Sequence, residues 1–177
     1  MVEKSIIDDL IISKRDTFRS LVVMMCGVAG SGKTTFAQQL EEEGFIRLSI
    51  DEEIWATNGR YGIDYPTDKY EEYKEAAENK LCKLLVKLIQ DKQHVVVDFS
   101  FWQRSRRTKY KRLIEENGGE WKLIYLKVHP NDLRKRLKIR SQRLDANAAF
   151  PITEEVLTSF LKGFEVPTDE GEIVIEY

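Results

Sequence analysis

The sequence predicts an α/β fold of three layers, with a parallel five-stranded sheet between two layers of helices and with a small lid. Two observations lead to this prediction. Segments with strand patterns and segments with helix patterns alternate along the chain, which is typical of parallel sheets. Residues 21–26 are apolar throughout, as in a strand that is buried on both faces of such a sheet. The 177 residues are expected to form a single domain over residues 1–177.

The expected elements follow one another in βαβ order, which implies parallel strands joined by helices. We expect strands at residues 21–26, 45–50, 94–98, 121–128 and 172–177. We expect helices at residues 33–43, 67–91, 103–117 and 131–143, with a last helix that begins at Thr153. Apolar side chains at steps of three and four residues mark the longest of them. An amphipathic extension over residues 1–20 precedes the first strand. We expect a helix packed on the outside of the sheet there, with an interaction arm as the alternative.

Composition and charge exclude several classes of protein. The 28 basic and 30 acidic residues leave a net charge of −2, so the chain as a whole has no general attraction to nucleic acid or membranes. Two cysteines cannot form a disulfide framework, which fits a reducing compartment. The longest apolar run is far shorter than the roughly 20 residues that cross a bilayer, and the N-terminus forms no signal peptide. We therefore expect a cytoplasmic protein without membrane contact.

A glycine-rich loop after the first expected strand carries the strongest functional signal. Residues 27–35 match the Walker A pattern G-x-x-x-x-G-K-[ST], between a buried strand and an amphipathic helix. Glycines let the backbone fold around a phosphate with its N–H groups inward, and the helix adds the positive end of its dipole. The pattern predicts a P-loop NTPase fold that binds ATP. The loop residues expected to hold the nucleotide are Gly27, Gly30, Ser31, Gly32, Lys33, Thr34 and Thr35.

Mg²⁺ is the expected metal, because P-loop proteins bind the triphosphate together with this cation. The Thr34 hydroxyl is expected to be one ligand. Asp98 ends the apolar run 95–97, which resembles a Walker B strand, and we expect it to hold Mg²⁺ directly or through water. A solvated strand-end acid or a helix cap is the alternative for Asp98.

Lys33, Asp51 and Arg143 are the residues predicted to carry the chemistry. Lys33 can reach the β and γ phosphates. Asp51 follows the second expected strand, where a kinase needs a carboxylate that accepts the proton of the acceptor hydroxyl. A helix cap is the alternative role for Asp51, and Glu52 is the alternative base.

Twelve basic residues are gathered on two expected helices, six between 104 and 112 and six between 134 and 143. Most of them are interpreted as solvated helix charges. The second group leads into a predicted lid over residues 136–152, from which arginines can reach a phosphoryl group. Arg143 lies nearest the lid loop and is the first choice, and Arg140 lies three residues before it.

The order of these motifs resembles the small P-loop kinases and phosphotransferases of the adenylate-kinase-like branch. This group includes the kinase domain of polynucleotide kinases, the zeta toxins, chloramphenicol phosphotransferase and gluconate kinase. The similarity runs over about residues 21–170. It implies that Asp51 is the catalytic base, that Arg143 touches the transferring phosphate, and that Arg136 or Arg140 stacks on adenine.

Two positions depart from the pattern of that group. Ile54 stands where several relatives have an arginine that helps to hold an acidic substrate, and Ser100 stands where many have asparagine. The first departure weakens the case for a polynucleotide or a strongly anionic acceptor. The second leaves the contacts around Asp98 open.

The acceptor is expected to be a small molecule with a hydroxyl group, such as an antibiotic, a sugar or a nucleoside-like compound. Residues 52–66 are expected to form a mobile acceptor flap, in which Trp55, Tyr61 and Tyr65 either contact the acceptor or pack in the core. Tyr70 and Tyr73 are assigned to the core. A polynucleotide 5′-hydroxyl kinase, for which nucleic acid is the partner, is a less favoured alternative, and a non-catalytic ATP-binding regulatory module is another. The oligomeric state stays open.

Overall fold

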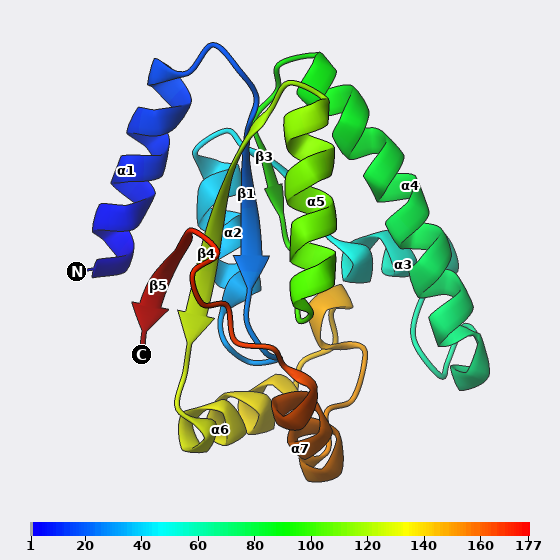
Figure 1. Ribbon diagram of the computed structural model, residues 1–177. Helices are drawn as coiled ribbons and strands as arrows, with labels where there is room; N and C mark the ends of the chain where they lie inside the picture. Colours follow the sequence, from blue (N-terminus) through cyan, green and yellow to red (C-terminus); the bar gives the residue numbers. More distant parts are fainter. Residues whose placement is uncertain (1) are drawn as a thin grey trace.

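A parallel five-stranded sheet forms the centre of the computed structural model, which describes residues 2–177 (Figure 1). Its strands are β1 (Leu21–Cys26), β2 (Ile46–Leu48), β3 (Val95–Val97), β4 (Glu120–Lys127) and β5 (Glu172–Glu176). They lie in the order β2-β3-β1-β4-β5, and every neighbouring pair is parallel. The predicted fold class is confirmed, because each parallel connection crosses over through helices.

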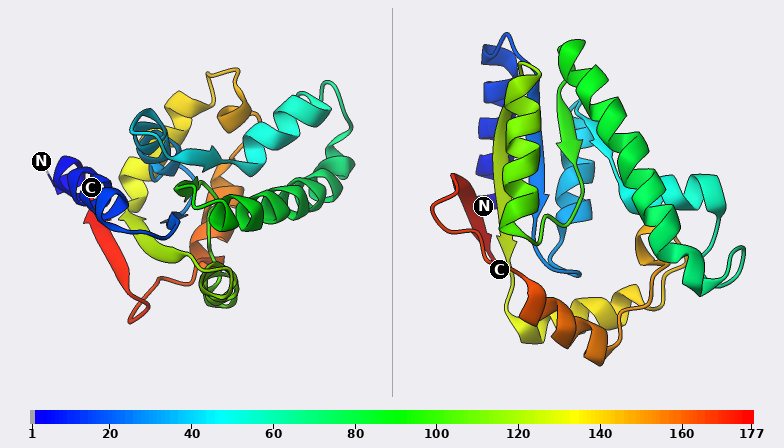
Figure 2. Two further views of the ribbon diagram at one scale, coloured as in Figure 1. Left: turned by 90° about the horizontal axis from the view of Figure 1, so that it is seen from above. Right: turned by 45° about the vertical axis from the view of Figure 1, so that its right-hand side comes forward.

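Helices cover both faces of the sheet (Figures 1 and 2). They are α1 (Val2–Asp16), α2 (Lys33–Glu42), α3 (Ile50–Asn58), α4 (Tyr70–Gln90), α5 (Arg104–Glu116), α6 (Pro130–Arg140) and α7 (Glu154–Gly163). Alternate residues of β1 divide the core in two. Val22 and Met24 pack with side chains of α4 and α5, whereas Val23 and Met25 pack with those of α1 and α2. Because both faces of β1 are buried, the strand has no polar position.

The N-terminal extension forms α1, which packs on the outside of the sheet through the buried Leu10. Lys14 Nζ donates a hydrogen bond to the Glu43 carbonyl oxygen at 2.7 Å and lies over the Phe45 ring. These contacts join α1 to the end of α2. Across residues 2–177, every helix is either too short or too polar to cross a membrane.

Helix α3 occupies much of the segment 52–66 that the sequence predicted to be a mobile flap. The Ser49 hydroxyl caps it by accepting a hydrogen bond from the Glu52 N–H at 3.4 Å. Asp51 therefore lies in the first turn and is not the cap, so the helix-cap interpretation of Asp51 is wrong. Ile50 and Ile54, one turn apart, are buried and hold α3 on the core. Two apolar residues are too few to give a clear helical period, which is why the pattern did not predict this helix.

The predicted lid, residues 136–152, covers the second half of α6 and the short helix Ala146–Ala148, and α7 follows it (Figure 2). The helix expected over residues 131–143 runs from Pro130 to Arg140, and the Thr153 hydroxyl caps α7 by accepting a hydrogen bond from the Val156 N–H. The lid lies beyond the carboxyl ends of the strands, marked by the arrowheads in Figure 1. Ligands of open parallel sheets bind at this edge.

Candidate active site

A cleft of about 930 Å³ opens between the glycine-rich loop, the lid and the first turns of α3, α4 and α5. It gathers side chains that are more than 100 residues apart in the sequence, from Gly30 to Arg143. Gly27 is buried behind the loop. The predicted site residues that line the cleft are Gly30, Ser31, Gly32, Lys33, Thr34, Thr35, Asp51, Asp98, Arg136, Arg140 and Arg143.

The glycine-rich loop has the backbone that a phosphate cradle requires. Gly27 has φ +151°, and a Cβ there would lie 2.5 Å from Ser31 Oγ, so no larger residue fits without a shift. The Ser31 hydroxyl is buried and finds no hydrogen-bond partner among residues 2–177. Lys33 Nζ donates to the Val28 carbonyl oxygen at 2.9 Å, and burial lowers the pKa of this ammonium. An orphaned hydroxyl and a buried cation at one loop fit the oxygens of a bound phosphate.

Thr34 and Asp98 meet beside this loop, where the sequence predicted the metal. Both side chains line the cleft, and the Asp98 carboxylate is only 3% exposed. Burial raises the pKa of Asp98, and Arg47 and Lys33 oppose that shift. In the described part of the chain no three His, Cys, Asp or Glu side chains group as a metal cage. A hydroxyl and one carboxylate nevertheless fit Mg²⁺, which binds through few protein oxygens and keeps several waters.

Arg47 is a buried part of this site that the sequence reasoning missed. Its Nη2 and Nε donate to Asp98 Oδ2 at 2.9 and 3.2 Å, and its Nη1 donates to Glu52 Oε1 at 2.6 Å. Its Nη2 also lies 3.3 Å from Asn147 Oδ1 in the lid, and the Asn147 amide donates to Glu52. Arg47 thus joins β3, α3 and the lid. The available signal was a charged residue at the centre of a short strand, between Ile46 and Leu48.

Asp51 faces the loop from the first turn of α3. Burial raises the pKa of its carboxyl group, and the cations Arg140, Lys33 and Lys74 oppose that shift. A carboxylate with a raised pKa beside three cations is well suited to take a proton from a hydroxyl group near neutral pH. Glu52, the alternative base, is bound by Arg47 and Asn147 and does not line the cleft among the described residues.

The three lid arginines take different positions along the cleft. Arg136 Nη1 donates to the Ser31 carbonyl oxygen at 3.2 Å, and its guanidinium lies 5.0 Å from the centre of the Tyr177 ring. Burial lowers the pKa of Arg140, and the negative charge of Asp51 is the strongest effect opposing that shift. Arg143 is half-exposed and paired with Asp145 at 2.8 Å. The roles of these arginines toward a nucleotide stay a prediction.

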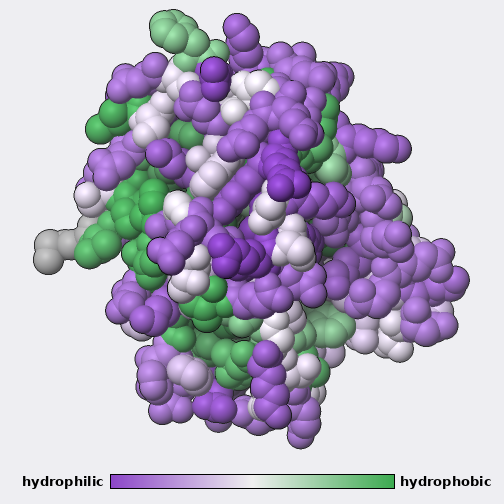
Figure 3. Space-filling model, in the orientation of Figure 1, coloured by the Kyte–Doolittle hydropathy of each residue, from purple (hydrophilic) through white to green (hydrophobic). Residues whose placement is uncertain are grey.

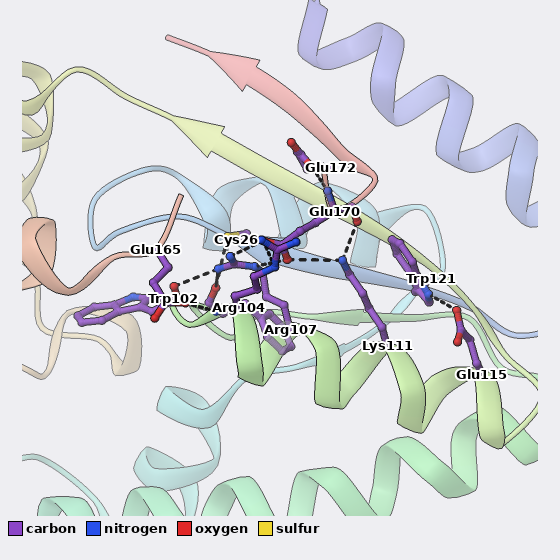
Figure 4. A network of polar contacts seen from close by, with 11 residues as sticks. Cys26, Trp102, Arg104, Arg107, Lys111, Glu115, Trp121, Glu165, Glu170 and Glu172 are labelled. Carbon is purple, nitrogen blue, oxygen red and sulfur yellow. Dashed lines mark hydrogen bonds and ion pairs between the residues drawn. The ribbon is translucent and has the colours of Figure 1, made fainter. Parts of the chain in front are cut away.

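The loop between β3 and α5 forms one wall of the cleft and is held by a buried ion pair (Figure 4). Arg107 donates two hydrogen bonds to the Glu170 carboxylate, at 2.7 and 2.8 Å, and two more to the carbonyl oxygens of Phe101 and Trp102. Phe101 has φ +44°, a left-handed conformation that needs such support. Arg107 is fully buried, so the interpretation of the helix charges as mostly solvated does not hold for it.

Of the two roles left open for the aromatic residues that follow Asp51, the structure agrees with core packing for Tyr61 and Tyr65. In the described part of the chain, Trp55, Tyr61 and Tyr65 do not line the cleft. Tyr61 packs edge-on against Tyr65 and against Phe150 of the lid. Tyr70, which was assigned to the core alone, lines the cleft and stacks on Phe150 with 4.8 Å between the ring centres. Tyr70 also packs against the core, as assigned, so it serves both: it is the first residue of α4, where the apolar stripe reaches the cleft.

Comparison with known proteins gives the family. The AAA_33 family, described as an AAA domain, matches residues 22–167. The L-seryl-tRNA(Sec) kinase of Methanococcus maripaludis is 26% identical over 148 residues, which are 83% of this chain and 53% of that protein. The chain therefore spans about half the length of this curated relative.

Two solved structures have a similar fold. A sugar kinase from Janibacter sp. HTCC2649 has a TM-score of 0.57 and 22% identity, with 90% of this chain and 86% of that chain covered. Kti12 of Chaetomium thermophilum, in complex with ADP-AlF3, has a TM-score of 0.61 and 14% identity, with 88% and 89% covered. At these identities the likeness shows the fold alone. Taken with the match over residues 22–167, these comparisons confirm the resemblance expected from the motifs, and the chain belongs to the AAA_33 family of P-loop kinase-like domains.

Proposed function

We propose that this protein is an ATP- and Mg²⁺-dependent phosphotransferase that phosphorylates a hydroxyl group of a small molecule. The observation that carries the proposal is the meeting of Lys33, Asp51 and Arg140 in one cleft. A phosphate-binding loop alone serves many nucleotide-binding proteins. A carboxylate with a raised pKa, facing that loop from another element, adds the group that a kinase needs for its acceptor.

In the proposed reaction, the acceptor oxygen attacks the γ phosphorus of ATP while the bond from this phosphorus to the β–γ bridging oxygen breaks. Asp51 takes the proton of the attacking hydroxyl, and the products are a phosphate monoester and ADP. Lys33 and the lid arginines Arg140 and Arg143 would stabilise the negative charge on the transferred group. When bound, Mg²⁺ would neutralise charge on the phosphates, and Thr34 and Asp98 would hold it.

The nucleotide assignment rests on the loop and on the lid. Gly30 to Thr35 line the cleft, and Arg136 lies beside Ser31, where the predicted stacking arginine would approach the nucleoside. Kti12, which shares the fold, was solved with ADP-AlF3. That complex supports the proposal that ATP fills the same loop in this chain.

A small acceptor is favoured over a polynucleotide by the charges around the acceptor end. The hollow that continues from the cleft between α4 and α5 is lined by four glutamates and three cations. A polyanionic strand leaving the cleft there would meet Glu71, Glu72, Glu75 and Glu78. The curated relative is named as a kinase of a tRNA-linked seryl group, so an RNA-borne acceptor is the second candidate.

The experiment is phosphoryl transfer from γ-labelled ATP with Mg²⁺ to a panel of sugars, nucleosides, antibiotics and short RNAs. Asp51→Asn is expected to keep ATP affinity and to slow transfer by about 10²- to 10⁴-fold. Asp68→Asn, which changes an exposed aspartate of the neighbouring turn, is the matched control and should transfer at the wild-type rate. Unchanged transfer by Asp51→Asn would remove Asp51 from the mechanism, and slow hydrolysis without any labelled product would favour a regulatory ATP-binding module.

A further inference from the structure

The acceptor end of the cleft contains buried hydrogen-bond donors that have no partner in the protein. Trp102 Nε1 and Arg106 Nε are both shielded from solvent, and neither has a hydrogen-bond partner within residues 2–177. Both side chains line the cleft. Because a buried donor without an acceptor costs about 1–3 kcal/mol, two of them in one wall indicate a ligand atom that accepts hydrogen bonds.

Two aromatic rings and one carboxylate hold the Arg106 guanidinium in the wall of the cleft. Its guanidinium carbon lies 5.7 Å from the centre of the Phe99 ring and 5.8 Å from that of Phe101. Glu78 pairs with its Nη2 at 2.8 Å, and Glu78 also accepts a hydrogen bond from the Tyr110 hydroxyl. The contact with Glu78 is an ion pair, and neither Nε nor Nη2 of Arg106 has a hydrogen-bond partner among residues 2–177, so both can serve a second anion.

Lys74 supplies another cation from α4, one turn before Glu78. It projects from α4, lines the cleft and is close enough to Asp51 to oppose the rise in the pKa of that carboxyl group. Its ion pair with Glu71, at 3.3 Å, joins two partly or largely exposed side chains and holds it weakly. Arg106 and Lys74 thus lie on two different helices around the acceptor end.

The surroundings limit the size of the anion. Four glutamates of α4 line the outer hollow together with three cations, Lys74, Arg106 and Lys109, and the surface over these helices is mostly hydrophilic (Figure 3). A chain of phosphates extending outward would meet these carboxylates. A single oxyanion bound inside the cleft, against Arg106 and Trp102, would not meet these carboxylates.

We propose that the acceptor carries one oxyanion, a carboxylate or a phosphate, which binds Arg106 and Trp102, with Lys74 of α4 as a second cation lining the same cleft. This inference rests on the proposed function, because it assumes that this end of the cleft holds the acceptor. Several relatives have an arginine at the position of Ile54, and in this chain Lys74 of α4 and Arg106 of α5 would supply that positive charge instead. The oxyanion accepts hydrogen bonds from the free N–H groups of Arg106 and Trp102. The hydroxyl group of the same molecule then extends toward Asp51.

The first test is binding of inorganic sulfate to the full chain saturated with Mg²⁺ and a non-hydrolysable ATP analogue, which fills the phosphate loop. Calorimetry is expected to show saturable binding that Arg106→Gln weakens by about tenfold or more and Trp102→Phe by a few-fold. Arg112→Gln, which removes an exposed guanidinium further along α5 and away from the cleft, should bind as the wild type does. Absence of saturable sulfate binding, or equal affinity in all four proteins, would overturn the proposal.

The second test compares acceptors that differ only in the anion. Glycerate and glycerol 3-phosphate are each paired with glycerol, and a six-carbon sugar acid is paired with its sugar alcohol. The anionic member is expected to have the lower KM, by about tenfold, and Arg106→Gln should remove that advantage where Arg106→Lys keeps part of it. The carboxylate and phosphate pairs distinguish the two sources of the oxyanion.

The outcomes separate this inference from the proposed function. Transfer to neutral acceptors with no effect of Arg106→Gln on any anionic acceptor would overturn the oxyanion site and leave the kinase intact. Sulfate binding that depends on Arg106, without transfer to any acceptor, would support the oxyanion site and count against the kinase.

Discussion

The pairing of Arg107 with Glu170 allows a quantitative prediction for stability (Figure 4). The two side chains are 0% and 5% exposed, and they are joined by two parallel hydrogen bonds of 2.7 and 2.8 Å. Glu170→Gln keeps the shape and removes the negative charge. The guanidinium then stays buried without a counter-charge. The amide oxygen can still accept one hydrogen bond, and the carbonyl oxygens of Phe101 and Trp102 keep theirs.

Removing one partner of a buried ion pair typically costs about 3–5 kcal/mol. Since Arg107 keeps two backbone acceptors, the expected loss in the free energy of unfolding lies near the lower end, about 3 kcal/mol. For a domain of this size, 1 kcal/mol shifts the Tm by about 2–4 °C, so Glu170→Gln should melt about 6–12 °C below the wild type. Thermal unfolding followed by circular dichroism measures this shift.

Glu176→Gln is the matched control. It removes the partner of Lys127 in an ion pair whose two side chains are more than half exposed, and such pairs contribute about 0–1 kcal/mol. If the two variants lose the same free energy of unfolding, within about 1 kcal/mol, the reasoning that burial makes the Arg107 pair different is refuted.

The dependence on pH gives a second check of the same pair. Hydrogen bonds from Arg107 hold the pKa of Glu170 below its ordinary value of 4.5. The stabilisation from a carboxyl group with a lowered pKa is complete above the pKa of the unfolded chain and is lost as the pH falls through the folded pKa. The difference in Tm between wild type and Glu170→Gln should therefore be constant near neutral pH and shrink below about pH 4.5.

Three further predictions concern the cleft. Because burial raises the pKa of Asp51, kcat/KM for phosphoryl transfer should fall on the acid side at a pH above the usual range for an aspartate, as a pH–rate profile measures; a profile that stays flat down to pH 4 contradicts this. Arg47 is the main group that lowers the pKa of the buried Asp98, so Arg47→Gln should leave more of this carboxyl group protonated and nucleotide binding should need more Mg²⁺; an unchanged midpoint in a Mg²⁺ titration would be the opposite result. Gly27→Ala places a Cβ 2.5 Å from Ser31 Oγ and should weaken ATP binding by about tenfold or more in calorimetry, whereas wild-type affinity would mean that the loop tolerates the shift.

Local patterns explain what the sequence alone could predict. The apolar run of β1, the glycines that follow it and the helix that begins at Lys33 are contiguous, so the interactions that shape them lie within the single segment from Leu21 to Glu42. Residues 27–35 therefore specified the phosphate loop, and the alternation of strands and helices specified the parallel sheet. Asp51 and Asp98 were chosen because they follow strands whose carboxyl ends must share one edge.

The tertiary structure alone decided which charges are buried and with which partners. Arg107 and Glu170 are 63 residues apart, and Arg47 and Asp98 are 51 residues apart, so no local period connects them. Their pairing depends on the strand order, in which β2 lies beside β3, and on the path that leads from α7 back to β5. A charged side chain in a helix or strand pattern has the same appearance in the sequence whether it faces water or an ion-pair partner. Only packing, which removes the water, decides between the two.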